Sequence, residues 1–254
     1  MSGIFTRRAL IRSGFAGGAA TLLAGCDKVQ DWAPARKILL SGDKLNHGLQ
    51  RALIDRAALA PEFRPDQMSP VFRVNGTADP GTPAYHALAA GRFADWTLAV
   101  TGLVARPLQL TLAQLRSMPQ RTQITRHDCV EGWSAIGQWR GPQLRQVLTL
   151  AGLSPAARFV VFRCADQIGG HPYYESIDLV DAFHPQTILA LAMNGQPLTV
   201  GHGAPVRLRV ERQLGYKQAK YVMGVEAVAS LAGIGKGRGG YWEDNVDYDW
   251  YAGI

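Results

Sequence analysis

Apolar residues along the chain recur in short stretches, and their spacing predicts many short strands and few helices. We expect strands over 71–75, 96–100, 123–125, 159–163, 205–210 and 224–230, a strand or short helix over 176–182, and a loop over 77–92. Helical spacing is found over 48–60, 111–118 and 143–151. Thr111 is suited to cap the second helix and Gly152 to end the third. Because strands and helices do not alternate regularly, the pattern predicts an α+β fold with mixed β-sheets and short helices.

The chain divides into three parts by composition. Residues 1–26 place Arg7 and Arg8 before an apolar stretch rich in glycine and alanine, which is typical of a Tat export signal. This part ends in a lipobox-like tetrapeptide whose Cys26 is a candidate lipid anchor; the alternative is a plain Tat signal with a chance cysteine. Residues 27–70 form a polar, proline-rich extension and linker, and 71–254 form a single folded domain. We therefore expect a periplasmic protein, with anchoring to the inner membrane as a lipoprotein if Cys26 is lipidated.

The overall charge excludes few partners but argues against nucleic acid. The 254 residues carry a net charge of +7, and the lysines and arginines are scattered without a long basic run. The three cysteines are too few for a disulfide framework or a zinc site. With Cys26 assigned to the N-terminal signal, Cys129 and Cys164 remain as candidates for chemistry.

Two stretches carry the residues suited to chemistry. Residues 126–134 place Cys129 among charged and aromatic neighbours, where it is either a buried small hydrophobic residue or a reactive thiolate. Residues 193–220 combine four glycines with six basic side chains, a mixture that suits a phosphorylated cofactor, although a solvated basic face fits the spacing equally well. Neither a Walker sequence nor a strand-linked dinucleotide loop is present.

These pieces, taken in order, resemble the molybdopterin-binding domain of the sulfite oxidase family. The resemblance covers roughly 70–250 and is closest to the catalytic subunits of bacterial periplasmic methionine sulfoxide reductases. It is carried by Cys129-Val130-Glu131-Gly132-Trp133-Ser134, Trp139-Arg140-Gly141, Met193-Asn194-Gly195, His202-Gly203-Ala204-Pro205-Val206-Arg207 and Gly215-Tyr216-Lys217-Gln218-Ala219-Lys220.

The resemblance implies a molybdenum-molybdopterin cofactor and a role for each matching residue. Cys129 matches the thiolate that ligates molybdenum, a chemically sensible soft ligand. The pterin and its phosphate are expected to contact Asn75, Cys164, His202, Arg207, Gln218, Ala219 and Lys220, with a buried structural thiol as the alternative for Cys164. Tyr241 and Trp242 are candidates for the substrate pocket, the alternative being a packed surface tail. His127 is either a proton donor or a structural histidine.

Departures from the family pattern bear on the reaction. Asp128 stands where the reductases carry an arginine, and the arginine-rich sequence that follows the cysteine in sulfite oxidases is missing. We therefore expect two-electron oxygen-atom transfer from a small S-oxide or N-oxide, with sulfite oxidation or a catalytically silent binding lipoprotein as alternatives. No haem-attachment sequence is present, so the resemblance implies a separate membrane haem or quinol-linked electron partner. Because the sequence ends at Ile254 without an immunoglobulin-like dimerisation domain, we expect a monomer.

Overall fold

The computed structural model describes residues 32–254. The predicted export signal and its lipobox, residues 1–26, lie outside the described residues. The chain divides into two compact units, 1–50 and 51–254, and the second holds both larger sheets. No helix within the described part of the chain is both long enough and apolar enough to cross a membrane.

Helix α2 spans Ala33–Leu53, so the predicted helix over 48–60 was wrong in its bounds. It begins fifteen residues earlier and ends before the proline-rich linker. Apolar residues at helical spacing, including Ile38, Leu45 and Leu49, do extend upstream. Gly42 and Gly48 interrupt this pattern, and glycine is a weak helix former. The turns of α2 before Gly48 were therefore not predicted from the sequence.

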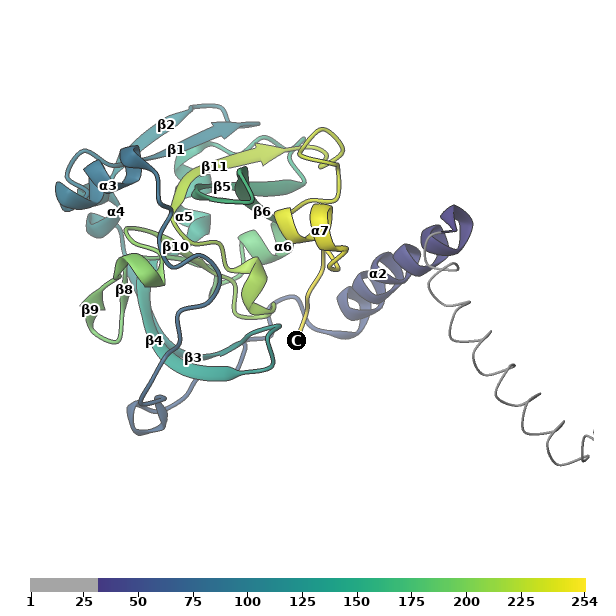
Figure 1. Ribbon diagram of the computed structural model, residues 1–254, viewed down its shortest axis with the longest axis horizontal. Coiled ribbons are helices and arrows are strands. Elements are labelled where there is room, and N and C mark those ends of the chain that lie inside the picture. Colours follow the sequence, from purple (N-terminus) through teal and green to yellow (C-terminus); the bar gives the residue numbers. More distant parts are fainter. Residues whose placement is uncertain (1–31) are drawn as a thin grey trace, which may run out of the picture. The chain divides into compact units, whose positions relative to one another are not determined.

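A five-stranded mixed sheet forms the larger part of the second unit, and its order is β2-β1-β11-β5-β6. In Figure 1 it lies above the β3–β4 hairpin. Its strands are β1 (Thr97–Gly102), β2 (Leu108–Thr111), β5 (Phe159–Ile168), β6 (His171–Asp178) and β11 (Val222–Val228). Only the β1–β11 pair is parallel. The centre of β5 is buried as its apolar run predicted, with Val160, Val161 and Phe162 fully buried.

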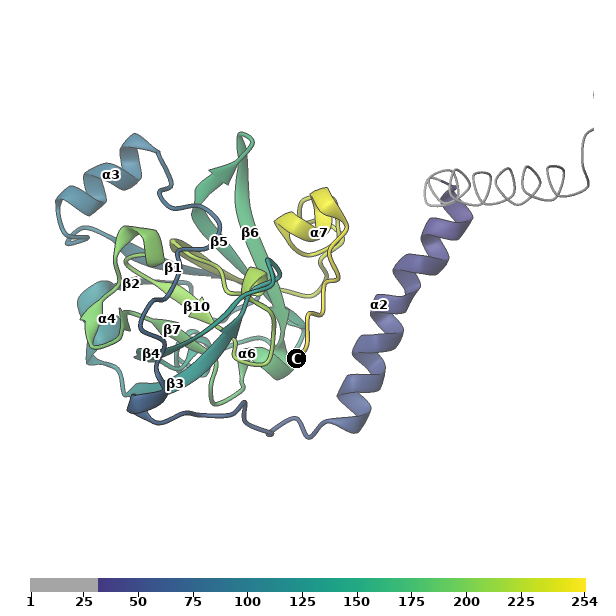
Figure 2. The ribbon, with the colours of Figure 1, turned by 60° about the horizontal axis from the view of Figure 1, so that its bottom comes forward.

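Two smaller sheets complete the α+β fold, and the long β3–β4 hairpin curves beneath the first sheet (Figure 2). The four-stranded sheet runs in the order β3-β4-β8-β9 and β10 pairs with β7. The bounds are β3 (Gln120–Asp128), β4 (Ser134–Pro142), β7 (Ile188–Ala190), β8 (Ala192–Met193), β9 (Gln196–Pro197) and β10 (Arg207–Arg209). The mixed sheets and short helices confirm the predicted fold class.

The short helices follow local capping signals. In α4 (Leu112–Ser117), Thr111 caps the N-terminus with Gln114 in a capping box, and α5 (Leu144–Ala151) ends at Gly152 in the left-handed conformation, both as predicted. The predicted loop over 77–92 was wrong, because α3 (Pro83–Ala90) forms there behind the N-cap Thr82. The remaining helices are α6 (Leu179–Ala182), α7 (Tyr241–Val246) and the 3-10 helices η1 (Pro65–Gln67), η2 (Val200–His202) and η3 (Gly215–Lys217).

The predicted strand over 71–75 does not form, although the segment is extended. Its apolar alternation has another cause. Phe72 packs against His127, Trp133, Trp139 and His202, while Val71 on the opposite side is exposed. The segment thus crosses the β3–β4 hairpin through ring contacts without joining a sheet, and it carries Asn75 to the pocket described next.

Candidate cofactor site

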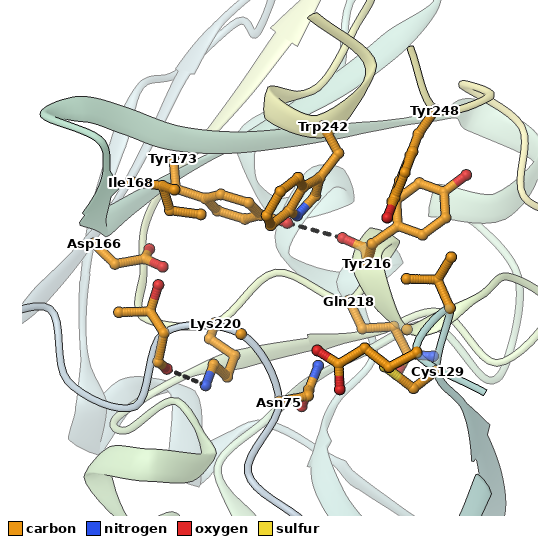
Figure 3. A pocket seen from close by; sticks show the side chains of 15 residues that line it. Asn75, Cys129, Asp166, Ile168, Tyr173, Tyr216, Gln218, Lys220, Trp242 and Tyr248 are labelled. Carbon is orange, nitrogen blue, oxygen red and sulfur yellow. Dashed lines mark hydrogen bonds between the residues drawn. The ribbon is translucent and has the colours of Figure 1, made fainter. Parts of the chain in front are cut away.

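One pocket collects the ends of several elements that are far apart in the sequence (Figure 3). The segment after Phe72, the loop after β3, the far end of β5, the start of β6, η3 and the C-terminal residues around α7 all contribute to it. Four of the residues predicted to bind the cofactor line it, namely Asn75, Cys129, Gln218 and Lys220. The sequence motifs, separated by up to 145 positions, therefore converge on one cavity.

Cys129 lies where β3 ends and the hairpin turns back into β4. Its backbone N–H donates to the carbonyl of Trp133 at 2.9 Å, and its carbonyl accepts from the N–H of Gly132 at 3.0 Å. These bonds close the loop and hold the thiol in the pocket wall with 8% of the residue exposed. Burial raises the pKa of the Cys129 thiol, so a protonated thiol is favoured unless a metal or cation takes the place of the proton.

Arg207 lies fully buried on β10 directly behind Asn75. Its Nη2 donates to Asn75 Oδ1 at 3.2 Å, whereas Nε and Nη1 have no partner. Burial and the neighbouring Arg209 lower the pKa of Arg207 to about 9. A buried guanidinium with two unsatisfied donors is costly, and an anion is the ligand that would compensate it.

Lys220 and Asp166 occupy the same side of the pocket. The Lys220 ammonium donates to the carbonyls of Thr77 and, at 2.9 Å, Gly201. Burial and Arg207 lower the pKa of Lys220 to about 7, while burial raises that of Asp166 to about 6. Oδ1 of Asp166 is buried without a partner. On this side of the pocket, burial therefore disfavours the charged forms of both Lys220 and Asp166.

His127 lies beneath the pocket and is completely buried. Its Nδ1 accepts a hydrogen bond from Arg209 Nη1 at 3.1 Å, so its proton resides on Nε2. Burial, with Arg209 and Arg207, lowers the pKa of His127 well below its ordinary value. A Cβ on Gly215 would lie 2.5 Å from Nε2, so the ring packs directly against the pocket wall. These contacts favour the structural role over the proton donor.

The other residues predicted to bind the cofactor, and Tyr241, do not line the pocket. Both ring nitrogens of His202 have hydrogen-bond partners in the protein. Nδ1 lies 2.9 Å from Thr199 Oγ1, and Nε2 lies 3.2 Å from the Phe72 carbonyl. Ala219 is in the core, where its carbonyl accepts from Leu208 N–H at 2.8 Å. Cys164 packs against the same core as a free thiol, and the Tyr241 hydroxyl donates to the Ile168 carbonyl at 3.0 Å.

Besides the four residues predicted to bind the cofactor, the pocket is lined by eleven others, and four of them are aromatic. Trp242 stacks on Tyr248 with ring centroids 5.9 Å apart, and Tyr248 meets Tyr216 edge-on at 5.0 Å. Tyr173 donates its hydroxyl to the Tyr216 carbonyl at 2.9 Å. We call Trp242, Tyr248 and Tyr216 the aromatic roof, because they enclose the pocket on the side opposite Asn75 in Figure 3. The acidic, aromatic character of 241–251 was the only sequence signal for this wall.

Asp128, the departure noted beside Cys129, does not face this pocket. Its carboxylate accepts from Arg126 Nε at 2.9 Å and from the Ser134 hydroxyl. The acidic side chain that lines the pocket next to the thiol is Glu131, which accepts from Trp133 Nε1 at 2.9 Å. The local acidic character near the thiol thus comes from Glu131.

Comparison with known proteins shows the family to which the chain belongs. The model of the oxidoreductase molybdopterin binding domain matches residues 86–231, more than half of the chain. The chain belongs to this family. A putative protein-methionine-sulfoxide reductase subunit, YedZ1 of Azospira oryzae, is 38% identical over 247 residues, which cover 97% of this chain and 87% of that protein. The protein-methionine-sulfoxide reductase catalytic subunit MsrP of Campylobacter jejuni is 31% identical over 144 residues, 52% of this chain and 48% of that protein.

Among solved structures, the sulfane dehydrogenase SoxCD of Paracoccus pantotrophus shows a TM-score of 0.49 at 23% identity, covering 54% of this chain and 39% of that one. This likeness adds nothing to the assignment. The family match and the two relatives confirm the predicted resemblance to molybdopterin oxidoreductases of the sulfite oxidase type. The protein is therefore a molybdopterin-binding oxidoreductase.

The pocket fits a molybdopterin in its chemistry. The cofactor carries a phosphate, and the two free donors of Arg207 supply the buried cationic site that a phosphate needs. Lys220 lines the pocket and adds a second cation, whereas Arg207 lies behind the pocket wall, bonded to Asn75. Within residues 32–254 no three His, Cys, Asp or Glu side chains gather as a metal site. The Cys129 thiol stands in the pocket wall without a second cysteine beside it.

Proposed function

We propose that this oxidoreductase reduces an S-oxide or N-oxide at a molybdenum centre, with methionine sulfoxide as the leading substrate. The observation that carries this proposal is the 38% identity over 97% of the chain to a relative described as a methionine-sulfoxide reductase subunit. The second relative carries the same activity in its name. The pocket supports the proposal because a buried thiol, buried cations and an aromatic roof meet in it.

Each pocket residue takes a role that its position allows. Cys129 holds the metal through its sulfur, and Arg207 and Lys220 bind the cofactor phosphate, with Asn75 orienting the Arg207 fork. Gln218 contacts the cofactor from the pocket wall. His202 and Ala219 lie behind that wall and support it through hydrogen bonds to backbone groups: His202 to the Phe72 carbonyl, and the Ala219 carbonyl to Leu208 N–H. When bound, the cofactor supplies two-electron oxygen-atom transfer between substrate and water.

The remaining wall favours a neutral substrate. The aromatic roof offers apolar surface to the alkyl arms of a sulfoxide. Once Arg207 and Lys220 bind phosphate, the charged side chains left in the wall are the carboxyls of Glu131 and Asp166. Since carboxylates repel anions, sulfite is the less suitable substrate.

Export and an external electron donor belong to the same proposal. The sequence of residues 1–26 supports Tat export to the periplasm with an anchor at Cys26. A monomer that receives electrons from a membrane haem or quinol-linked partner fits a chain without a haem-attachment sequence. Mutating Cys26 to serine and following membrane association tests the anchor separately from the activity.

The deciding experiment compares substrates and cysteine variants in the exported holoprotein. We expect about one molybdenum per chain and reduction of methionine sulfoxide with a reduced viologen dye, with little oxidation of sulfite. Cys129→Ser is expected to fold and be exported but to lose activity. Cys164→Ser is the matched control for metal content, because its thiol lies in the core and not in the pocket.

Three outcomes would contradict the proposal. Turnover by Cys129→Ser would refute the assignment of Cys129 as the metal ligand. A clear preference for oxidising sulfite would show that the proposed direction of the reaction is wrong. A wild-type protein free of molybdenum after growth with ample molybdate would favour the binding lipoprotein.

A further inference from the structure

Three charged side chains from three different elements meet in a completely buried cluster beside the pocket. Glu175 comes from β6, Lys217 from η3 and Glu243 from α7, and each is 0% exposed. The Lys217 Nζ lies 2.6 Å from Glu175 Oε2 and 2.5 Å from Glu243 Oε1. One ammonium therefore bridges two carboxyl groups. We call these three residues the carboxyl-lysine cluster.

The second oxygens of the two carboxyl groups face each other. Glu175 Oε1 and Glu243 Oε2 are buried and have no hydrogen-bond partner among residues 32–254. A Cβ on Gly240 would lie 2.7 Å from the first and 2.0 Å from the second, so both oxygens crowd the same backbone position. Gly240 is therefore the residue that admits both carboxyl groups. Two bare carboxylate oxygens in this arrangement would repel each other.

The surroundings do not supply a second positive charge. Among the residues that the structure describes, Lys217 is the only cation within salt-bridge distance of either carboxyl group. The other titratable groups that interact with the cluster are Tyr173 and Tyr174 on β6 and Cys164 on β5. None of them is a cation. With both carboxyl groups ionised, the buried cluster would carry a net negative charge, which is strongly disfavoured.

The cluster connects the elements that build the aromatic roof. Glu243 is next to Trp242 in α7, and Lys217 is next to Tyr216 in η3. Tyr248 lies between these two rings and contacts both. Glu175 is two residues along β6 from Tyr173, which also lines the pocket. The ammonium lies 5.9 Å from the ring centroid of Tyr216. Salt bridges through Lys217 thus tie α7 to η3 and β6.

We propose that Glu175 and Glu243 share one proton, and that the resulting neutral carboxyl-lysine cluster positions the aromatic roof over the pocket. One proton between the two facing oxygens satisfies both of them and leaves one negative charge to balance the Lys217 ammonium. Burial and the nearby Glu243 raise the pKa of Glu175 well above its ordinary value, which agrees with this arrangement. The three residues are positioning residues, since they touch neither substrate nor cofactor. The inference goes beyond the proposed reduction and holds for any substrate of this pocket.

Infrared difference spectroscopy on the holoprotein tests the shared proton directly. A protonated carboxyl group has a C=O stretch that ionised carboxylates lack. We expect this band in the wild type at neutral pH and its loss in both Glu175→Gln and Glu243→Gln, because the remaining carboxyl group then ionises against Lys217. Asp166→Asn identifies any band from the other buried carboxyl group with a raised pKa. Absence of the band from the wild type, or its survival in both glutamine variants, would overturn the shared proton.

The pH dependence of the roof tests the positioning role. A carboxyl group whose pKa is raised in the native protein makes the native arrangement less stable as pH rises from the ordinary carboxyl pKa through the raised one. We therefore expect the wild-type KM to rise, and the Trp242 emission to shift, toward alkaline pH with kcat little changed at first. Glu243→Gln keeps the packing and the Lys217–Glu175 pair but needs no shared proton, so its KM and emission should be flat over the same range.

Two controls make this second test decisive. Trp242→Phe identifies the contribution of that ring to the emission. Lys217→Met, which leaves two buried carboxyl groups without a counter-charge, should lose the roof or fail to fold, and Glu243→Gln carries the test in either case. Identical pH profiles of KM and emission in the wild type and Glu243→Gln would overturn the positioning role, even if the infrared band confirmed the proton. Cofactor content measured in parallel separates these outcomes from failure of the proposed reductase activity.

Discussion

Two arginines on β10 are equally buried but differ in their partners, and replacing each by methionine should have opposite effects on the cofactor-free protein. Arg207 donates one hydrogen bond, to Asn75, and leaves Nε and Nη1 free. Arg209 is fully used, with bonds of 3.0 and 2.6 Å to the two oxygens of Glu211 and a third to His127. Methionine keeps an unbranched apolar stem at either position but lacks the charged guanidinium group.

The expected magnitudes follow from these contacts. Removing Arg209 leaves the buried Glu211 without its counter-charge and with only the hydrogen bond from Gln123, which costs about 3–5 kcal/mol and lowers Tm by roughly 6–20 °C in a domain of this size. Removing Arg207 eliminates a buried, poorly satisfied cation, so stability should be unchanged or rise by about 1–4 kcal/mol. For the cofactor the effect of Arg207→Met reverses. Two hydrogen bonds to a charged phosphate are worth roughly 3–6 kcal/mol together, or about 10²- to 10⁴-fold in affinity.

The assay needs each variant in two forms. The proteins are produced in cells that cannot make molybdopterin, and thermal unfolding is measured by circular dichroism. The same variants are produced in cofactor-competent cells, and molybdenum is measured before and after dialysis. We expect Arg207→Met to unfold no earlier than the wild type while losing its cofactor. A loss of stability in cofactor-free Arg207→Met equal to that of Arg209→Met, or full retention of molybdenum, would refute the assignment of Arg207 to the phosphate.

Two further predictions concern the same wall. Burial lowers the pKa of Lys220 to about 7, so the affinity of the cofactor-free protein for the cofactor should fall as pH rises above that value. Lys220→Met should bind the cofactor more weakly, and its affinity should not change over this pH range. Binding titrations from acidic to alkaline pH measure both affinities, and the same pH dependence in the wild type and the variant would contradict the prediction. Gly215→Ala would bring a Cβ to 2.5 Å from His127 Nε2 and should reduce cofactor content several-fold. Gly233→Ala is the control, because open space surrounds that glycine and its cofactor content should not change. Equal cofactor content in the two variants would show that the pocket wall can shift to accept the extra methyl group.

The sequence pattern predicted the fold best where local signals and packing agree. Thr111 and Gly152 were recognised at the ends of α4 and α5, since capping depends on neighbouring residues. The strand over 71–75 was predicted from alternation alone. The structure explains that alternation by the ring contacts of Phe72, which are long-range and leave no local trace. In α3 the opposite occurred, because the Thr82-Pro83 start was present but the short helix lacks a strong apolar face.

The candidate site divides along the same line. Cys129, Gln218 and Lys220 were predicted as site residues because they lie in recognisable motifs, and they meet in the pocket. Tyr173 and Tyr248 lie in no such motif and reach the pocket only through the tertiary arrangement of β6 and the C-terminal segment. Tyr241 and Trp242 are neighbours on one short helix. The sequence could not tell which of the two rings faces the pocket, and the structure places Trp242 there and bonds Tyr241 to Ile168.

The unsatisfied charges around the pocket couple cofactor retention to folding. Arg207 holds two free donors and Lys220 has a depressed pKa, so the cofactor-free protein bears the cost of both. A ligand that binds only the native state stabilises it in proportion to its occupancy and affinity. A phosphate that satisfies these donors therefore recovers a penalty that the folded chain otherwise retains. The same reasoning gives the Arg207–Arg209 comparison its force, because only one of the two arginines is left unsatisfied by the protein itself.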